Sequence, residues 1–185
     1  MMDWDERFGK MQQHTGEHIV SGLVHAKFGY DNVGFHLAGT YCTMDFSGEI
    51  GEEDLRRIEW LANEAVVKNL DVEVLYPTKE ALAGMEYRSK IEIEGQVRIV
   101  VIPGYDTCAC CAPHVKKTGE IGLIRLTDSQ RYKGGVRVTM LCGFRALEDY
   151  RQKSMSVRRI SNHLCVKEED VFAAVERVKG ECAQL

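Results

Sequence analysis

The sequence contains little proline and lacks the features that would direct a chain into or across a membrane. It has three prolines in 185 residues and no run of about 18 apolar residues, the length needed to span a bilayer. Its N-terminus, MMDWDERFGK, is charged and has none of the apolar stretch of a signal peptide. Repeats and low-complexity segments are also absent. These absences exclude membrane-spanning and repeat proteins, and they predict a cytoplasmic location.

A disulfide framework is also missing. The seven cysteines are an odd number, and without a secretion signal we expect them to be reduced thiols or metal ligands. Cys42, Cys142, Cys165 and Cys182 fall on apolar stripes, where we expect small buried hydrophobic side chains. The hydrophobic fraction of 44% is ordinary for a globular protein, which excludes a disordered or fibrous chain.

The hydrophobic periodicity predicts an α+β protein. Apolar residues at helical spacing mark two long helices, at residues 4–28 and 52–69. The order of elements is not a regular alternation of strand and helix, so we expect a two-layer sandwich: an antiparallel or mixed sheet with the long helices on one face. We expect one domain at residues 1–150 and a C-terminal helical extension, residues 151–185, packed on it. The predicted strands are 33–38, 41–46, 71–76, 96–102, 120–126 and 135–142, with further helices at 79–83, after Gly143 and at 167–178.

Charge is unevenly distributed along the chain. The formal net charge is −4, which argues against a protein that grips nucleic acid over its whole surface. Residues 1–115 carry a net charge of −9, whereas residues 116–160 carry 11 basic and 4 acidic side chains, a net charge of +7. The basic stretch is either a solvated face or a local patch that contacts phosphates.

Two short clusters offer metal ligands. In His14-Thr-Gly-Glu-His18 the two histidines are four residues apart, so on a helix both imidazoles lie on one face. Cys110 and His114 have the same spacing in a predicted loop. Together they form a nitrogen and sulfur set suited to tetrahedral Zn²⁺, with Cys108 and Cys111 as rival thiolates.

The spacing leaves the type of metal site open. Four protein ligands would close a structural site, whereas a catalytic site needs an open position for water. A remote alternative is the H-x-x-E-H pattern of zinc peptidases, with Glu17 as the base and Glu92 or Glu94 as a carboxylate ligand. That alternative gives no account of Cys110 and His114.

Several longer motifs resemble one family. MQQHTGEHIVS (residues 11–21), GFHLAGTYCTMDF (34–46), the Cys110-x-x-x-His114 pair, TGEIG (118–122) and GVRVTMLCGFRAL (135–147) occur in the order found in the alanyl-tRNA editing family. This family comprises the editing domain of alanyl-tRNA synthetase and its free-standing AlaX-type relatives, and it is related to the second additional domain of threonyl-tRNA synthetase. The resemblance covers residues 3–150, and the fold it implies is that of this additional domain.

The resemblance implies a zinc-dependent deacylase. Such proteins hydrolyse the ester that joins a wrongly attached serine or glycine to the 3′ end of alanine tRNA, so the implied partner is the tRNA acceptor end. By position, one Zn²⁺ per chain would be held by His14, His18, Cys110 and His114.

Each remaining candidate near this implied site has two interpretations. Gln13 either orders water or the substrate amine, or is an exposed polar residue on the helix. Glu17 either acts as a base or points outward, and His36 either lines the pocket or is a satisfied core histidine. Gly34 and Phe35 are expected to bind substrate, because the strand at 34–36 is expected to form the floor of the pocket.

The motif that follows the ligand loop is also open to two interpretations. Thr118 and Gly119 either bind substrate or form the turn into a strand. Within the basic stretch, the residues expected to contact tRNA are Lys116, Lys117, Arg131 and Lys133.

Two classes of function remain in competition. One is the deacylase, with Ser-tRNA(Ala) as the expected substrate, and the other is a non-catalytic, zinc-stabilised module that binds tRNA or a synthetase. The sequence departs from the family where Cys111, Ala112 and Pro113 replace a glycine-rich stretch, and it lacks the upstream domain of longer members. A short free-standing editor and a piece of a longer protein with further domains both fit, and the oligomeric state stays open.

Overall fold

The computed structural model describes residues 3–89 and 95–184, and it divides into two units, Met1–Ala146 and Leu147–Leu185. The first unit begins with α1 (Trp4–Phe28), which is capped by the Asp3 carboxylate accepting from the Asp5 and Glu6 amides. It ends where Gly29 takes a left-handed conformation, φ 70°. The second long helix, α2 (Glu52–Lys68), carries three acidic residues in its first turn, which the helix dipole favours.

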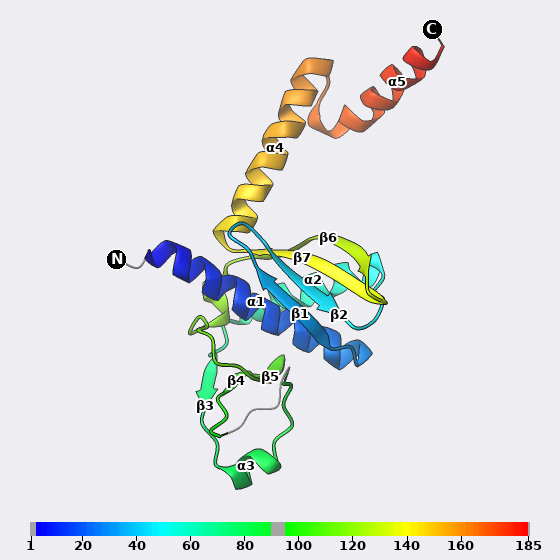
Figure 1. Cartoon of the computed structure of the whole chain (residues 1–185). Coiled ribbons are helices and arrows are strands. Elements are labelled where there is room, and N and C mark those ends of the chain that lie inside the picture. Colours follow the sequence, from blue (N-terminus) through cyan, green and yellow to red (C-terminus); the bar gives the residue numbers. More distant parts are fainter. Residues whose placement is uncertain (1–2, 90–94, 185) are drawn as a thin grey trace. The chain divides into compact units, whose positions relative to one another are not determined.

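A four-stranded antiparallel sheet forms the centre of the first unit (Figure 1). Its strand order is β1-β2-β7-β6, so hairpins from the two ends of this unit meet in the middle of the sheet. The register places Met44 beside Val138 and Cys42 beside Met140, which brings the β2 and β7 core positions together. The strands are β1 (Asn32–Leu37), β2 (Cys42–Phe46), β6 (Ile124–Tyr132) and β7 (Gly135–Cys142).

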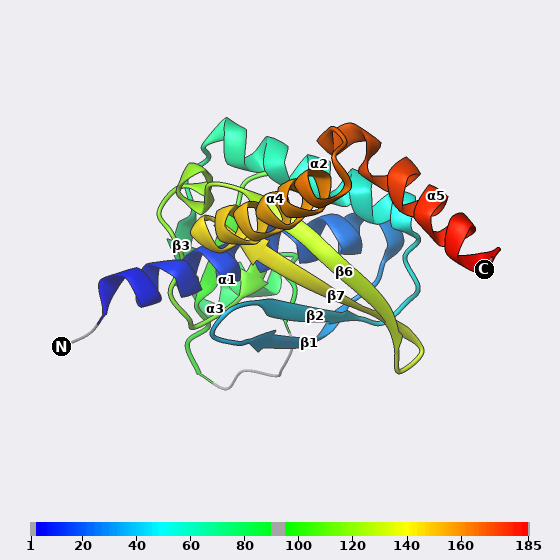
Figure 2. The same ribbon diagram turned by 90° about the horizontal axis from the view of Figure 1, so that it is seen from above.

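Both long helices cover the same face of this sheet (Figure 2). Ile19 and Ile58 from the helices and Met44 and Met140 from the sheet are fully buried in the layer between them. Gly16 permits the close approach of α1, because a Cβ atom there would lie 2.6 Å from Cys142 Sγ. The predicted α+β class, with antiparallel strands and long helices on one face, is confirmed.

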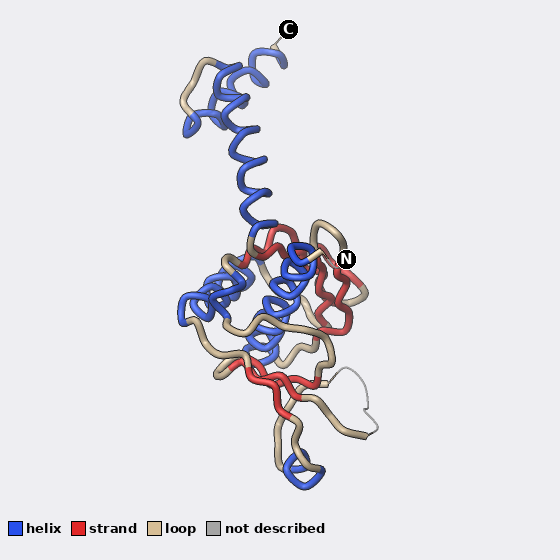
Figure 3. The backbone as a smooth tube through the Cα atoms, turned by 90° about the vertical axis from the view of Figure 1, so that its left-hand side faces the viewer, coloured by secondary structure: helices blue, strands red, loops and turns tan. Residues whose placement is uncertain are grey.

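The remaining strands form a second, three-stranded sheet rather than extending the first (Figure 3). Its order is β3-β4-β5, formed by Glu73–Leu75, Ile99–Ile102 and Asp106–Ala109, with the short helix α3 (Lys79–Ala83) between β3 and β4. The hydrophobic pattern does not reveal β5, because a four-residue strand with two polar side chains carries too little signal. This strand matters because Cys110 directly follows it.

The second unit is helical. It contains most of α4 (Phe144–Leu164), a 3₁₀ turn at Glu168–Asp170 and α5 (Val171–Ala183). Cys165 and Cys182 are exposed, so the expectation that they are core residues is wrong. Both lie in the unit that has few buried side chains among its described residues, whereas Cys42 and Cys142 are buried as expected. The domain boundary expected at residue 150 stays a prediction.

No helix in the described part of the chain combines the length and apolar character that a bilayer crossing requires.

Candidate metal centre

Four side chains from two distant segments converge beside α1. His14 and His18 come from the helix, and Cys110 and His114 come from the loop that follows β5. Their ligand atoms all lie within 4.8 Å of one another. The Cys110 sulfur is 3.5 Å from His14 Nε2, although the two residues are 96 positions apart in the chain. Such a cluster has the chemistry and the compactness of a tetrahedral zinc site.

Each histidine of the cluster is oriented by a hydrogen bond to its Nδ1 atom. His14 Nδ1 donates to the Pro113 carbonyl at 3.3 Å, and His18 Nδ1 donates to Asp106 at 2.9 Å. His114 Nδ1 lies 3.1 Å from the Thr15 hydroxyl. Because the hydroxyl donates its own hydrogen to the helix backbone, it accepts from the imidazole. All three rings therefore keep Nε2 free to bind a metal, the tautomer that such outer hydrogen bonds usually select.

One buried atom in the cluster requires a partner that the protein does not supply. His114 Nε2 is buried, and within residues 3–89 and 95–184 it makes no hydrogen bond. Buried polar atoms without partners are rare, because each costs desolvation energy that nothing offsets. A metal ion bound to this nitrogen would satisfy it, so the cluster fits Zn²⁺.

The pKa values of the cluster reflect this crowding. Burial opposes ionisation of Cys110, but the three imidazoles of His114, His14 and His18 around its sulfur lower its pKa to about 3, which favours the thiolate that binds zinc. Burial lowers the pKa of His114 to about 4. Burial would also lower the pKa of His18, but the hydrogen bond to Asp106, the Cys110 sulfur and the charge of Glu17 together outweigh it and raise the pKa to about 9. Zn²⁺ bound at His18 Nε2 would take the place of the proton on this imidazole.

Two groups that hold the cluster were not expected from the sequence. Asp106 is buried, and its carboxylate accepts from His18 and from the Arg88 guanidinium, at 2.7 and 2.9 Å. Burial alone would raise the pKa of Asp106, but hydrogen bonds from His18 and Arg88 lower it. The sequence feature that could have indicated this role is the position of Asp106, four residues before Cys110. The second group is Thr15, which lies between His14 and His18 in the sequence and holds the His114 imidazole.

The ligand loop is held by an arginine. The Arg98 guanidinium donates through Nη1 to the Cys110 carbonyl at 2.6 Å and to the Ala112 carbonyl at 3.1 Å. The Cys110 amide in turn donates to the Arg98 carbonyl. Arg98 therefore fixes the path of the loop on both sides of its first ligand.

The rival thiols occupy different positions. Cys108 is buried within β5, where it adjoins His18 and Asp106, and burial raises its pKa to about 12. Cys111 is exposed. The choice of Cys110 among the three stays a prediction, and the geometry of the four-residue cluster supports it. Glu92 and Glu94, which the peptidase alternative requires, lie outside the described residues.

The three catalytic candidates lie in three different environments. Gln13 is fully buried and bonds the Cys142 backbone with both polar atoms, so of its two interpretations the exposed polar residue is wrong. Glu17 also points inward, 2% exposed, because the helix face it shares with Gln13 packs on the sheet. His36 is exposed on β1, on the opposite sheet face from Phe35, because strand residues alternate.

The expected pocket floor does adjoin the cluster. The Phe35 ring stacks on His14 with their centroids 5.7 Å apart. Gly34 precedes it at an irregularity in the β1–β2 pairing. A Cβ atom on Gly34 would lie 2.7 Å from an oxygen of Asp45, so a larger residue would push β1 away from β2.

Thr118 and Gly119 pack against the end of α2. The Thr118 hydroxyl donates to the Ala65 carbonyl at 2.6 Å and accepts from the Leu70 amide. A Cβ atom on Gly119 would lie 2.4 Å from the Asn69 side chain. These contacts fasten the outgoing end of the ligand loop to the helix. They support the turn interpretation, and the proposed role in substrate binding stays a prediction.

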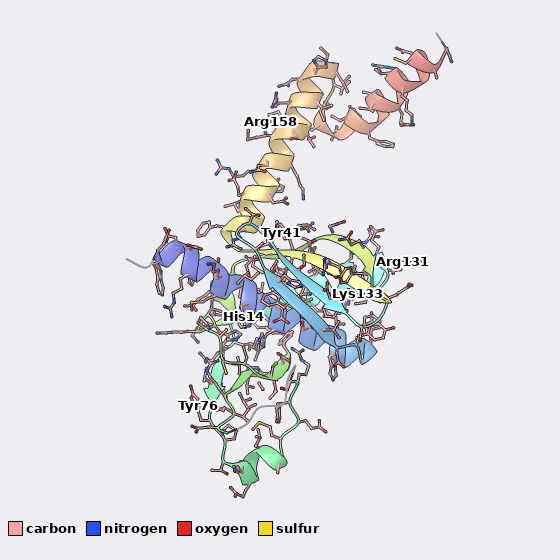
Figure 4. All side chains as sticks on the ribbon, in the orientation of Figure 1. His14, Tyr41, Tyr76, Arg131, Lys133 and Arg158 are labelled. Atoms are coloured by element: carbon pink, nitrogen blue, oxygen red, sulfur yellow. The ribbon has the colours of Figure 1, made fainter. Side chains whose placement is uncertain are left out.

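The structure does not gather the four expected tRNA contacts into one patch. Lys116 and Lys117 come two and three residues after His114, and Lys117 pairs with Asp71. Arg131 and Lys133 lie at the β6–β7 turn, away from His14 in the side-chain view (Figure 4). Many basic side chains of residues 116–160 also have acidic partners, such as Arg137 with Asp45. Of the four, Lys116 and Lys117 lie nearest the ligands in the chain.

Comparisons with known proteins agree with the geometry. The family described as the threonyl and alanyl tRNA synthetase second additional domain matches residues 97–139, which include Cys110 and His114. The chain is 31% identical over 149 residues to the alanyl-tRNA editing protein AlaX-L of Pyrococcus horikoshii, covering 79% of this chain and 37% of that protein. It is 34% identical over 146 residues to AlaX-M of Saccharolobus solfataricus, covering 74% and 60%.

Longer relatives match over nearly the whole chain. The alanine–tRNA ligase of Pyrococcus abyssi is 31% identical over 189 residues, covering 97% of this chain and 21% of that protein. The chain thus spans between about one fifth and three fifths of the length of these relatives.

Proposed function

Because the chain belongs to the alanyl-tRNA editing family, we propose that it is a zinc-dependent aminoacyl-tRNA deacylase that acts in the cytoplasm. Its proposed substrate is Ser-tRNA(Ala), with Gly-tRNA(Ala) as the second, and its partner is the acceptor end of alanine tRNA. The observation that carries the proposal is the convergence of His14, His18, Cys110 and His114 within 4.8 Å. Names of the relatives support the editing role.

The residues of the centre suit hydrolysis of an aminoacyl ester. A bound Zn²⁺ would supply Lewis-acid activation of the ester or of the attacking water. The protein itself contributes position: the hydrogen bonds to Pro113, Asp106 and Thr15 hold the three imidazoles, and Phe35 forms a wall against His14. An aminoacyl ester is already reactive, so its orientation by these residues would supply much of the required acceleration.

A second candidate function rests on the same cluster. Four protein groups can complete a tetrahedron by themselves, as in structural zinc sites that lack an open position. In that case the chain would be a zinc-stabilised module that binds tRNA or a synthetase without catalysis. Metal removal would then unfold the domain, and loss of His14 would abolish stability and binding together.

A deacylation panel separates the two functions. Zinc-loaded chain is mixed with Ser-, Gly- and Ala-tRNA(Ala), with and without chelator, and release of the amino acid is measured. The deacylase proposal expects serine release that stops with chelator, returns with Zn²⁺ and is absent in His14→Ala, whereas Cys111→Ser behaves as the parent. Intact, zinc-loaded chain that binds tRNA but releases no serine would support the module and defeat the deacylase.

A further inference from the structure

The face of α1 that carries His14 and His18 continues toward the start of the helix. Steps of three and four residues keep side chains on one helical face, and such steps lead back from the two ligands. The members of this ligand stripe are Trp4, Arg7, Met11, His14 and His18. At ~1.5 Å of rise per residue, Trp4 lies about 15 Å from His14 along the helix axis. The metal centre is thus at one end of a stripe that has an exposed tryptophan at the other.

The two directions along the ligand stripe differ. Beyond His18 the next positions, Ser21 and Gly22, are buried, and a Cβ atom on Gly22 would lie 2.0 Å from the Tyr105 carbonyl oxygen. Because Tyr105 lies in the turn between β4 and β5, the second sheet closes this direction. Toward the start of α1, the described residues 3–7 are exposed, and the helix extends past the strands of the first sheet (Figures 1 and 2). A long molecule whose end lies at the ligands has room along these first turns.

The exposed end of the ligand stripe presents an aromatic surface. The Trp4 ring stacks on Phe8, with centroids 6.2 Å apart and an angle of 19° between the planes, and the residue is still 63% exposed. Aromatic faces of this kind bind nucleobases of any sequence by stacking. Lys10 is exposed on the same side of the helix, and its ion pair with Glu6 is also exposed, so the pair contributes little and the ammonium can exchange to a phosphate. This end of α1 therefore has the chemistry of a surface for single-stranded nucleic acid.

The proposed substrate supplies such a strand. Its ester joins the amino acid to the last nucleotide of the unpaired 3′ end of tRNA, so the strand leads away from the metal centre. Nucleotides repeat at ~3.4 Å along a stacked strand and further apart in an unstacked one, so the distance from His14 to Trp4 spans on the order of two to four nucleotides. We propose that Trp4 stacks on a base of this unpaired 3′ end, a few nucleotides before the esterified one. This inference rests on the proposed deacylase function.

The first test lengthens the substrate one nucleotide at a time. Serine is esterified to adenosine and to the 3′ ends of CA, CCA and ACCA, and kcat/KM is measured with zinc-loaded protein. We expect the wild-type value to rise with length. Trp4→Ala should match the wild type on seryl-adenosine and fall about 10-fold short of it on the longest ester, the effect of losing one stacked base. Trp4→Phe, which keeps an aromatic face, should recover most of the difference.

A second tryptophan provides the matched control. Trp60 on α2 is 65% exposed, as Trp4 is, and its Nε1 atom donates to Glu64 at 3.1 Å. It lies on a different helix from His14 and His18. Trp60→Ala should therefore behave as the wild type on every ester of the series.

A binding measurement reports on the Trp4 ring directly. The probe is ACCA that ends in 3′-serylamido-3′-deoxyadenosine, whose amide this reaction does not hydrolyse. The chain has two tryptophans, so Trp60→Phe leaves Trp4 as the only one. We expect the probe to quench Trp4 emission to saturation in that variant, and to leave the emission of Trp60 unchanged in Trp4→Phe.

The possible failures are distinguishable. If Trp4→Ala matches the wild type at every length, or loses the same factor on seryl-adenosine, the inference is overturned while the deacylase stands. The same holds if the probe binds without changing Trp4 emission, or if that emission depends on protein concentration without RNA, which would show a second copy on this surface. If the wild type hydrolyses neither these esters nor Ser-tRNA(Ala), the proposed function itself fails. If Trp4→Ala does not fold, the emission of Trp4 in Trp60→Phe still decides.

Discussion

The two halves of the ligand cluster are built in different ways. The helical half, His14 and His18, needs only a regular α-helix, because a spacing of four residues places both imidazoles on one face. The loop half, Cys110 and His114, has the same spacing but no helix to align it. It is held by Arg98, by Thr15 and by the packing of Thr118 on α2. The same four-residue spacing therefore brings His14 and His18 together through helix geometry alone, whereas Cys110 and His114 are brought together only by tertiary contacts.

Removing one ligand from each half should have the largest effect. We expect His14→Ala and His114→Ala each to weaken zinc binding by about 100-fold or more, because each removes one of four converging donors. Zinc affinity is measured by competition with a chelating dye. Cys111→Ser is the control, and a matching loss in that variant would mean that the ligand set is misassigned.

The outer contact of His18 should have the next largest effect. Asp106→Asn is expected to lower zinc affinity by about 10- to 100-fold, because an amide cannot hold the His18 Nδ1–H as strongly as a carboxylate does. It also leaves Arg88 without its charged partner. The same dye competition gives the affinity, and thermal unfolding of the zinc-free chain reports any loss of stability. Unchanged affinity would show that the helix alone orients His18.

Substitution of Arg98 tests whether the loop that carries Cys110 and His114 depends on the hydrogen bonds from the Arg98 guanidinium. We expect Arg98→Met to lower zinc affinity by about 10-fold and to speed hydrogen exchange at residues 110–115, with exchange in α1 unchanged. Arg57→Met, an exposed arginine on α2, serves as the matched control. Equal acceleration in α1 and in the loop would contradict the contrast between the two halves.

The smallest expected effect is the loss of stability in acid that comes from the ion pair between Asp45 and Arg137. Hydrogen bonds from Arg137 hold the pKa of Asp45 below its usual value. The folded pKa is thus lower than the unfolded one, so this pair stabilises the protein above pH ~4 and the contribution is lost as pH falls through the folded pKa. Asp45→Asn should remove less than about 1 kcal/mol at neutral pH and shift the acid-unfolding curve slightly, without changing zinc affinity. A change in zinc affinity would link this face to the metal centre.

Much of the fold could be predicted from periodicity. The helix predicted at residues 4–28 is α1, and residues 135–142 form β7 as expected. The three-stranded sheet could not be predicted, because β5 is short and because β3 pairs with β4 across a long connection, with Leu75 opposite Ile99. Glu17 and Gln13 could not be assigned either, because helical spacing does not say which face of α1 packs against the sheet.

By itself the sequence determined the α+β class and placed the candidate metal ligands, histidines and a cysteine, in two clusters of matching spacing. Those properties depend on local periodicity and on side-chain chemistry, which a chain carries whatever its fold. Only the tertiary structure decided that the clusters meet, that the Cys110 sulfur lies with all three histidines, and that Glu17 turns inward. The physical reason is that convergence across 96 residues depends on how β5 and its loop pack against α1, and no short-range pattern records that packing.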